Sequence, residues 1–268
     1  MQFKLYKKTY KNKLRSYKIK DKIKFHQYLV NLLDIKKSDK VLDLGCGHGQ
    51  TLIYIARKLA ENGKVIGVDN DENLLAVAER VLKDEIMEGK IELTKSDISN
   101  NLPFFNNSYN KIVCHNVIEC IPNKNLFIDE CYRILKKNGI LIISHTDFDT
   151  QIFNSSYPEL SRSLVHNYCD TRQQWMKACD GMIGRKLFSI LNKNKFKNVE
   201  LKIYVMSNTK YKPFEYGYRI AQDIVDIAKK SKMFDAAELN TWLEDLKEKD
   251  NKGEFFYSSN IYMIIARK

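Results

Sequence analysis

The sequence predicts an α/β fold in which an open, mainly parallel sheet is covered by helices on both faces. The first observation is an alternation of short apolar runs with segments of helical periodicity, which continues from residue 23 to residue 145. The second is that the first apolar run breaks into glycines at positions 45, 47 and 49. A glycine turn between a strand and a helix lets the backbone approach a ligand closely, at the edge where open α/β sheets bind their ligands.

The alternating elements have identifiable ends. Asp71 is expected to cap the helix that Gly89 closes, and Gly63 is expected to end the helix before it. We expect helices at 23–35, 50–62, 71–88 and 125–138. We expect strands at 40–45, 64–69, 91–97, 109–116 and 139–145.

The alternation fails after residue 146. A polar stretch at 147–180 without a clear strand is followed by a helix at 181–193, a strand at 199–208, a helical region at 214–249 and a final strand at 255–268. Within the helical region, the spacing of Trp242 and Leu246 favours packing. We therefore divide the chain into a basic N-terminal arm (1–22), a cofactor-binding core (23–146) and a part that completes the sheet and adds helices as a lid (147–268).

Composition excludes several classes of protein. Of the 268 residues, 44% are hydrophobic and 29% are charged, and no apolar stretch approaches the roughly 20 residues of a membrane span. The first residues form no apolar signal segment, so we expect a cytoplasmic protein. The six cysteines form no CxxC pair and no Cys/His spacing suited to zinc, which predicts reduced thiols and no metal site.

The formal net charge of +12 is concentrated at the N-terminus. Residues 1–24 carry ten Lys or Arg against one acidic residue, Asp21, and three tyrosines lie among them. Such an arm suits contact with nucleic acid through phosphate pairing and base stacking. A solvated, lysine-rich surface segment explains the same composition and is the interpretation we favour.

Acidic residues follow two of the predicted strands. Asp69 ends the second strand, where a carboxylate can accept both hydrogen bonds of a ribose diol. Asp97 follows the third strand and can accept a hydrogen bond from an adenine amino group while Ile98 lies against the ring. The glycine spacing is GxGxG, since position 50 is Gln, and therefore differs from the GxGxxG of dinucleotide folds.

Four stretches together carry a resemblance to a known family. They read VLDLGCGHG, VIGVDND, SDISNNLPFFNNSYNKIVCHNVIECIP and ILKKNGILIIS, and they span about residues 40–145. In their order and spacing the chain resembles class I S-adenosylmethionine-dependent methyltransferases of the ubiquinone and menaquinone type. The resemblance implies a Rossmann-like, seven-stranded, doubly wound sheet with a final antiparallel strand, to which the helical insertions would add a lid.

The resemblance also implies which residues hold the cofactor. Asp43 and the loop Gly45, Cys46 and Gly47 would hold its methionine portion. Asp69 would bind the ribose with Asn70 beside the adenine, and Asp97 and Ile98 would bind the far edge of the base. His115 and Asn116 would lie near the methionine portion or the sulfonium.

The acceptor side is predicted from residues after the fifth strand. His145, which ends that strand, is the first candidate for a general base or an acceptor contact, and His115 is the second. Asp147 would orient such a histidine or contact the acceptor itself. Residues of the insertion that are candidates for lining an acceptor pocket are His166, Tyr168, Arg172, Trp175 and Arg185. Tyr168 and Trp175 suit the core of a lid equally well.

One departure from the family pattern concerns the acceptor pocket. Many relatives of the ubiquinone and menaquinone type carry Glu-His before an apolar residue and Pro, whereas this chain has Glu119 and Cys120 before Ile121 and Pro122. We therefore expect the pocket to differ there.

These features predict in-line methyl transfer from S-adenosylmethionine to a small metabolite or secondary metabolite, with no metal. Methylation of RNA or protein with the help of the basic arm remains an alternative, although no NPPY-type tetrapeptide follows the fourth strand. A third interpretation is a protein that binds S-adenosylmethionine without turnover. The sequence predicts neither the acceptor nor the oligomeric state.

Overall fold

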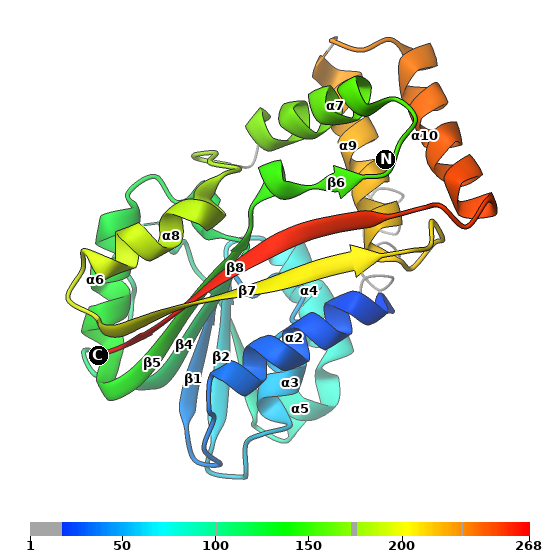
Figure 1. Ribbon diagram of the computed structural model, residues 1–268. Coiled ribbons are helices and arrows are strands. Elements are labelled where there is room, and N and C mark those ends of the chain that lie inside the picture. The colour runs from blue at the N-terminus through cyan, green and yellow to red at the C-terminus, as the bar shows by residue number, and fades with distance from the viewer. Residues whose placement is uncertain (1–17, 100, 173–175, 232) are drawn as a thin grey trace.

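The computed structural model describes residues 18–99, 101–172, 176–231 and 233–268, and their strands form one mixed sheet (Figure 1). The strands are β1 (Lys40–Leu44), β2 (Lys64–Asp69), β3 (Ile91–Lys95), β4 (Tyr109–His115), β5 (Leu135–Thr146), β6 (Ile152–Phe153), β7 (Lys197–Asn208) and β8 (Tyr257–Arg267). Their order is β3-β2-β1-β4-β5-β8-β6, and β7 also pairs with β8. The pairs from β3 to β5 are parallel, whereas β8 is antiparallel to β5, β6 and β7. This is the predicted seven-stranded sheet with a two-residue eighth strand, β6, added.

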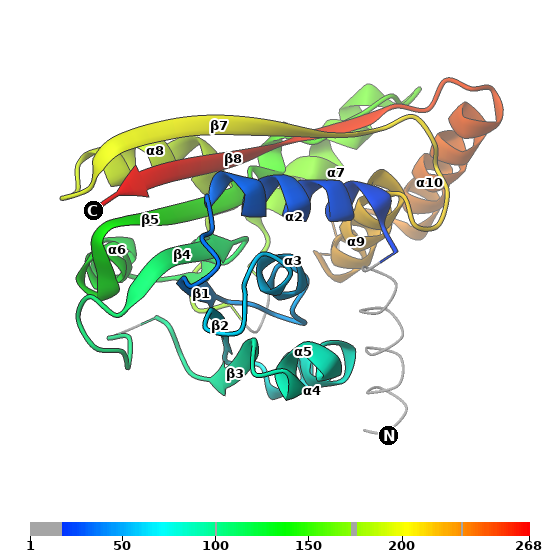
Figure 2. The ribbon, with the colours of Figure 1, turned by 90° about the horizontal axis from the view of Figure 1, so that it is seen from below.

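Helices cover both faces of the sheet (Figure 2). One face carries α2 (Lys20–Leu32), α3 (Leu52–Ala56), α4 (Glu72–Val81) and α5 (Lys83–Met87), and the other carries α6 (Lys124–Ile134) and α8 (Ile183–Asn192). Three further helices, α7 (Pro158–Asp170), α9 (Tyr216–Ser231) and α10 (Ala236–Asn251), stand together beyond one end of the sheet. Because β5 is antiparallel to β8, that end is where the parallel strands finish.

Strict alternation along the strands produces two separate cores. In β5, Ile140 and Ile142 pack with α2 and α3, whereas Leu141 and Ile143 pack with α6 and α8. All four side chains are at most 1% exposed. Continuous apolar runs in the central strands are thus explained by helices on both faces.

Several predicted boundaries were wrong, because tertiary contacts overrode local helical preference. The helix expected at 50–62 ends at Ala56, and the amide of Ala60 donates to the carbonyl of Lys37 instead. The helix expected at 71–88 breaks at the buried Leu82, although Asp71 caps it as predicted. Strand β5 begins at Leu135, within the helix expected at 125–138, because that residue pairs with Tyr109 of β4.

The polar stretch at 147–180 contains more regular structure than expected. It forms α7, the short strand β6 and a 3-10 helix at Phe148–Thr150. Another unpredicted 3-10 helix, Ile118–Cys120, follows β4.

The division into arm, core and lid stays a prediction, and residues 1–17 of the arm lie outside the described residues. Among the helices that the structure describes, none is long and apolar enough to cross a membrane.

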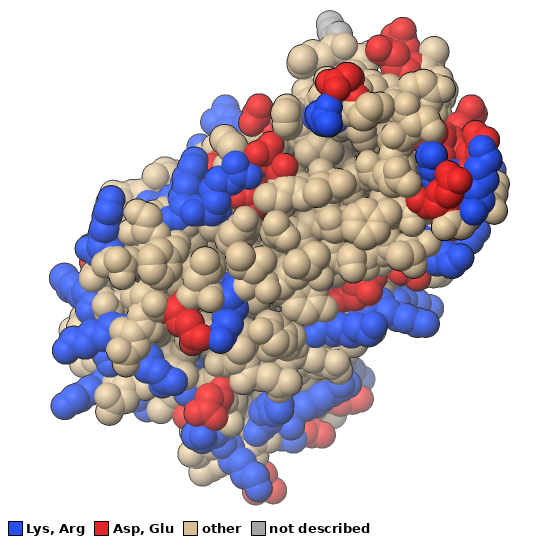
Figure 3. Space-filling view, viewed as in Figure 1, with Lys and Arg blue, Asp and Glu red and all other residues tan. Residues whose placement is uncertain are grey.

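One face of the molecule is only partly charged (Figure 3). An uncharged band follows β7 and β8, where Leu201, Ile203 and Val205 are 40%, 50% and 57% exposed. Lys and Arg side chains surround the band, with acidic residues between them. Positive charge on this face is therefore discontinuous.

The lid helices α7, α9 and α10 extend the core that α2 and α3 share with the sheet, and in it Trp242 and Leu246 are fully buried, as predicted. The indole nitrogen of Trp242 donates to Oγ of Ser161 at 3.0 Å, and its ring lies edge-on to Phe153 with the centroids 5.1 Å apart. The indole thus joins α10 to α7 and β6.

We expect Trp242→Ala to lower the free energy of unfolding by about 3 to 5 kcal/mol, because it leaves a cavity and an unpaired Ser161 hydroxyl. Urea titration followed by circular dichroism measures the change. Phe105→Ala is the control, since that ring is 88% exposed and its removal should change the free energy by about 0.5 kcal/mol or less. Equal effects of the two substitutions would contradict the packing described for the lid.

Candidate active site

A cavity of about 1380 Å³ lies at the carboxyl ends of the parallel strands. Its floor is made by the turns after β1, β2, β3 and β4, and α2, α7 and α9 contribute to its walls. All the residues predicted to bind a cofactor line it: Asp43, Gly45, Cys46, Gly47, Asp69, Asn70, Asp97, Ile98, His115 and Asn116. The sheet therefore brings together residues that lie up to 73 positions apart in the chain (116 minus 43).

Asp43 presents a buried carboxylate to this cavity. It is 2% exposed, and its Oδ2 has no hydrogen-bond partner among the described residues. Burial and then the nearby Asp69 raise the pKa of Asp43 to about 8. A cationic group placed here would stabilise the ionised form and give the unpaired oxygen a partner.

The glycine turn gives a ligand close access to the backbone. The amides of Gly45 and Cys46 both donate to the carbonyl of Val68, which fixes the turn across the end of β2. A Cβ on Gly45 would lie 2.3 Å from Val117, so only glycine fits. Gly47, at a φ of +54°, faces open space in the cavity.

Asp69 is held by the same turn. One carboxylate oxygen accepts the amide of Gly47 at 2.8 Å, and the other accepts the amide of Asp71 at 2.9 Å. Partial burial raises the pKa of Asp69, while these amides act against the rise. The lone pairs that remain can accept further hydrogen bonds, as a diol requires.

Asp97 already has a strong partner. Nζ of Lys177 lies 2.6 Å from its Oδ2, and Ser99 donates both its amide and its hydroxyl to Oδ1. The hydrogen bond from Lys177, followed by those from Ser99, lowers the pKa of Asp97 to about 2. The segment before α8 thus contacts this end of the cavity, a contact that the sequence did not predict.

Two neutral histidines line the opposite wall. Nδ1 of His115 lies 2.9 Å from Oγ of Ser144, and Nδ1 of His26 lies 3.1 Å from Oγ1 of Thr51. Burial, with Lys22 and then His48 nearby, lowers the pKa of His26 to about 3, and burial likewise lowers that of His115 well below its usual value. His26 was missed, although a histidine within an otherwise apolar helical face was a signal that could have found it.

Asn116 is positioned by β5. Its backbone has a φ of +52°, its Oδ1 accepts the amide of Thr146 at 2.8 Å, and its Nδ2 donates to the hydroxyl of Thr146 at 3.3 Å. Asparagine tolerates this left-handed conformation better than most residues. The side chain is therefore locked at the wall of the cavity.

His145 does not line the cavity, contrary to the expectation that it faces the cofactor. Its ring is fully buried, with Nδ1 2.6 Å from the carbonyl oxygen of Thr146 and Nε2 2.6 Å from Oε2 of Glu119. Glu119 does line the cavity and so lies between the imidazole and the open space. Burial acts to raise the pKa of Glu119, but the charge of His145 and the hydrogen bonds outweigh it and lower that pKa.

Asp147 is likewise turned away from the cavity. Arg185 binds it through Nε at 2.7 Å, through Nη2 at 2.8 Å and through its amide at 3.2 Å, and the carboxylate is fully buried. The pair joins the end of β5 to the start of α8. Asp147 and Arg185 therefore bind each other and do not make the contacts with an acceptor that the sequence predicted.

Of the five residues predicted to line an acceptor pocket, four lie in the described part of the chain, and of these only Tyr168 lines the cavity. Tyr168 does so from α7, where its ring meets Phe148 at a centroid distance of 5.4 Å. His166 lies 3.3 Å from Asp149 and is 63% exposed, and Arg172 is exposed outside the cavity. Trp175 lies outside the described residues.

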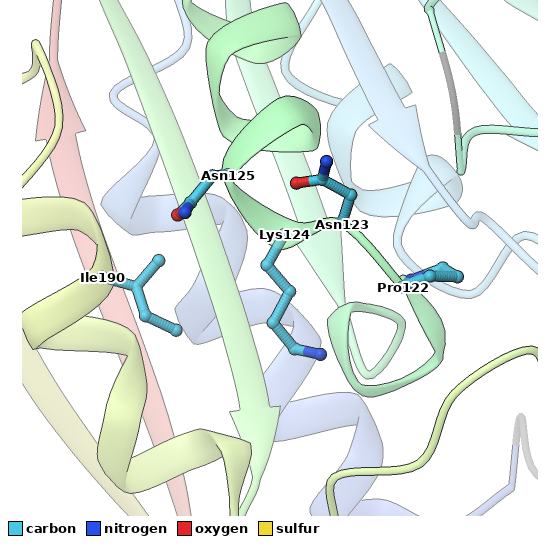
Figure 4. A pocket seen from close by; sticks show the side chains of 5 residues that line it. All are labelled: Pro122, Asn123, Lys124, Asn125 and Ile190. Carbon is cyan, nitrogen blue, oxygen red and sulfur yellow. The ribbon is translucent and has the colours of Figure 1, made fainter.

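A second hollow, about 550 Å³, lies beside the first turn of α6 (Figure 4). It is lined by Pro122, Asn123, Lys124, Asn125 and Ile190. None of the predicted site residues is among these. Within the part of the chain that the structure describes, no cluster of three or more His, Cys, Asp or Glu side chains suits a metal ion.

Comparison with known proteins adds a family to this geometry. Residues 35–204 match the family model described as "Methyltransferase domain". A demethylmenaquinone methyltransferase of Lactobacillus johnsonii is 25% identical over 62% of this chain and 71% of its own length. For the demethylmenaquinone methyltransferase of Staphylococcus saprophyticus, which is 30% identical over 47% of this chain, the match spans only 52% of the relative.

Solved structures share the fold at low sequence identity. A putative methyltransferase of Bacillus halodurans has a TM-score of 0.59 and 18% identity, with 91% of this chain and 98% of that one covered. The phosphoethanolamine N-methyltransferase 2 of Haemonchus contortus, in complex with phosphomonomethylethanolamine and S-adenosylhomocysteine, has a TM-score of 0.54 and 19% identity, with 90% and 51% covered. Since the family model matches more than half of its residues, the chain belongs to the methyltransferase-domain family, among the class I S-adenosylmethionine-dependent methyltransferases.

Proposed function

We propose that this methyltransferase acts on a small-molecule acceptor that enters beneath the lid helices. The proposal rests on one continuous cavity of about 1380 Å³. Sheet turns bound it at one end, and side chains of α7 and α9 bound it at the other. These two helices contribute four lining residues, which are Tyr168, Cys169, Arg219 and Ile227. Helices on that side favour a compact acceptor over a polymer.

The residues of the cavity fit S-adenosylmethionine. The unpaired oxygen of Asp43 suits the ammonium group of the methionine portion, and the open space over Gly47 admits ligand atoms close to the backbone. Asp69 retains lone pairs for the ribose hydroxyls, with Asn70 beside it. When bound, the cofactor supplies a methyl group made electrophilic by the sulfonium.

Asp97 and Ile98 suit the adenine, provided that Lys177 yields or shares the carboxylate that it now contacts. The remaining work of the protein is to hold the acceptor in line and to exclude water. The names of the relatives, demethylmenaquinone methyltransferases, make a reduced naphthoquinone the first acceptor to test.

Methylation of RNA remains the second candidate, on the basis of the ten Lys or Arg among residues 1–24. On the face that Figure 3 shows, positive charge is discontinuous, so that face adds no support to this candidate. The two candidates separate in one assay with S-adenosylmethionine labelled in its methyl group. Label in a short-chain demethylmenaquinol or in the small metabolites of an extract supports our proposal, whereas label confined to RNA or protein would overturn it.

We expect Asp69→Ala to weaken S-adenosylmethionine binding by about 10- to 100-fold, because hydrogen bonds from a ribose to a carboxylate contribute about 1.5 to 3 kcal/mol. Isothermal titration calorimetry measures the affinity. Glu72→Gln is the matched control, since this exposed carboxylate on the adjoining helix pairs with Lys95 and does not line the cavity. An unchanged affinity in the Asp69 variant would contradict the ribose assignment.

The raised pKa of Asp43 predicts a proton linkage. With a pKa of about 8, the carboxyl is mainly protonated at pH 7, and a bound cation would lower that pKa and release up to one proton. Affinity for S-adenosylmethionine should therefore rise with pH up to about 8. Calorimetry in buffers of different ionisation enthalpy measures the release, which Asp43→Asn should abolish.

The same pKa makes a prediction for the protein without ligand. Between the ordinary pKa of 3.8 and about 8, the folded state binds more protons at Asp43 than the unfolded state does, so stability falls as pH rises through this window. Asp43→Asn should flatten this part of the pH dependence in urea titrations. Equal slopes in both proteins would contradict a protonated Asp43.

A further inference from the structure

The pair of Glu119 and His145 is the buried charged group at the cavity wall that binding of the cofactor does not explain. The two side chains come from different elements, the 3-10 helix after β4 and the end of β5. They are 3% and 0% exposed, and 2.6 Å separates Oε2 of the carboxylate from Nε2 of the imidazole. Glu119 faces the cavity, with the imidazole behind it.

The contacts of the imidazole define where its protons are. Nδ1 lies 2.6 Å from the carbonyl oxygen of Thr146, and because a carbonyl only accepts, Nδ1 carries a proton. A neutral ring would then offer a bare Nε2 to a carboxylate oxygen 2.6 Å away, and two acceptors repel at that distance. A proton on one of the two atoms removes this repulsion, and the lowered pKa of Glu119 favours its place on the ring, as an imidazolium beside a carboxylate.

The neighbouring groups leave the negative charge on Glu119. Burial is the main cause that raises the pKa values of Cys120, Cys179 and Tyr168, so these groups are neutral at pH 7. His115 of β4 is neutral as well, because burial lowers its pKa. The carboxylate is therefore the anion available to an acceptor at this wall.

We infer that Glu119 is a catalytic residue that accepts the proton of the acceptor's hydroxyl group, and that His145 is the positioning residue that holds the carboxylate in place. This inference rests on the proposed function and deepens it, because it restricts the acceptor to an alcohol, phenol or enol. It also reassigns the base predicted from the sequence, since Glu119 shields His145 from the cavity.

The step balances without a further reactant. The acceptor's O–H bond breaks and its proton goes to a carboxylate oxygen of Glu119. The electron pair stays with the acceptor and forms the bond to the methyl carbon, at the oxygen or at a conjugated ring carbon, which then loses its own proton to water. The sulfur keeps the pair of the broken bond to the methyl group. A hydroxyl becomes strongly acidic as it shares electrons with the methyl carbon, so a carboxylate with a low pKa suffices.

The protons of the pair can be measured without any acceptor. We would record nitrogen NMR spectra of the full chain labelled with ¹⁵N in its five histidines, and assign His145 with the variant His145→Gln. Both ring nitrogens of His145 should be protonated at pH 7 in the wild type. In Glu119→Gln, Nε2 should lose its proton while Nδ1 keeps it. A bare Nε2 in the wild type, or no change in the variant, would overturn the inference.

Kinetics with a short-chain demethylmenaquinol as the probe test the catalytic role. Glu119→Gln should lower kcat by about 10²- to 10⁴-fold, while calorimetry should find S-adenosylmethionine affinity within about threefold of the wild type, less than the tenfold that 1.4 kcal/mol would give. Glu119→Asp should retain part of the turnover, and added formate should restore part of it to Glu119→Ala. Glu159→Gln, on the exposed side of α7, is the control for loss of one carboxylate.

The results separate the two proposals. Near-normal kcat in Glu119→Gln would overturn the inference and leave the proposed function intact. Failure of the wild type to methylate any small molecule would count against the proposed function, whereas methylation only of acceptors without a hydroxyl group would overturn the inference and leave the proposed function intact. Circular dichroism of each variant excludes misfolding as the cause of lost turnover.

Discussion

An unpaired carboxylate buried at the end of β1 is the constraint to which the rest of this site is arranged. Removing the charge of Asp43 from water is costly, and in the described residues no cation offsets the cost, so the carboxyl holds a proton up to a pH of about 8. The glycine turn, Asp69 and the cavity above them leave room for a ligand that brings the missing positive charge.

The two ends of the cavity handle protons in opposite ways. At the methionine end, Asp43 and Asp69 lie close together, and their repulsion adds to the effect of burial in keeping Asp43 protonated. At the lid end, the contact with His145 lowers the pKa of Glu119, so this carboxyl stays ionised. A cation should therefore settle at the first end, and a group that donates a proton should settle at the second.

The lid explains why family membership says little about the acceptor. The matched region ends at residue 204, before α9 and α10, whereas Arg219 and Ile227 of α9 line the cavity. Lys177, which contacts Asp97, comes from the loop between α7 and α8. Part of the cavity wall thus comes from a helix that lies beyond the matched region.

The sequence by itself determined the sheet and the cofactor wall. Strand and helix periods are local, and the carboxyl ends of parallel strands must share one edge, so Asp43, Asp69, Asp97 and His115 were predicted to meet and do line one cavity. It did not determine where helices would give way to tertiary contacts, as at Ala60 and Leu135, because pairing with distant residues overrides local preference. Nor did it reveal that Glu119 lies between His145 and the cavity, or that the carboxylate of Asp147 is paired with the guanidinium of Arg185. Which side chain faces a cavity depends on packing between elements far apart in the chain, and only the tertiary structure decides that.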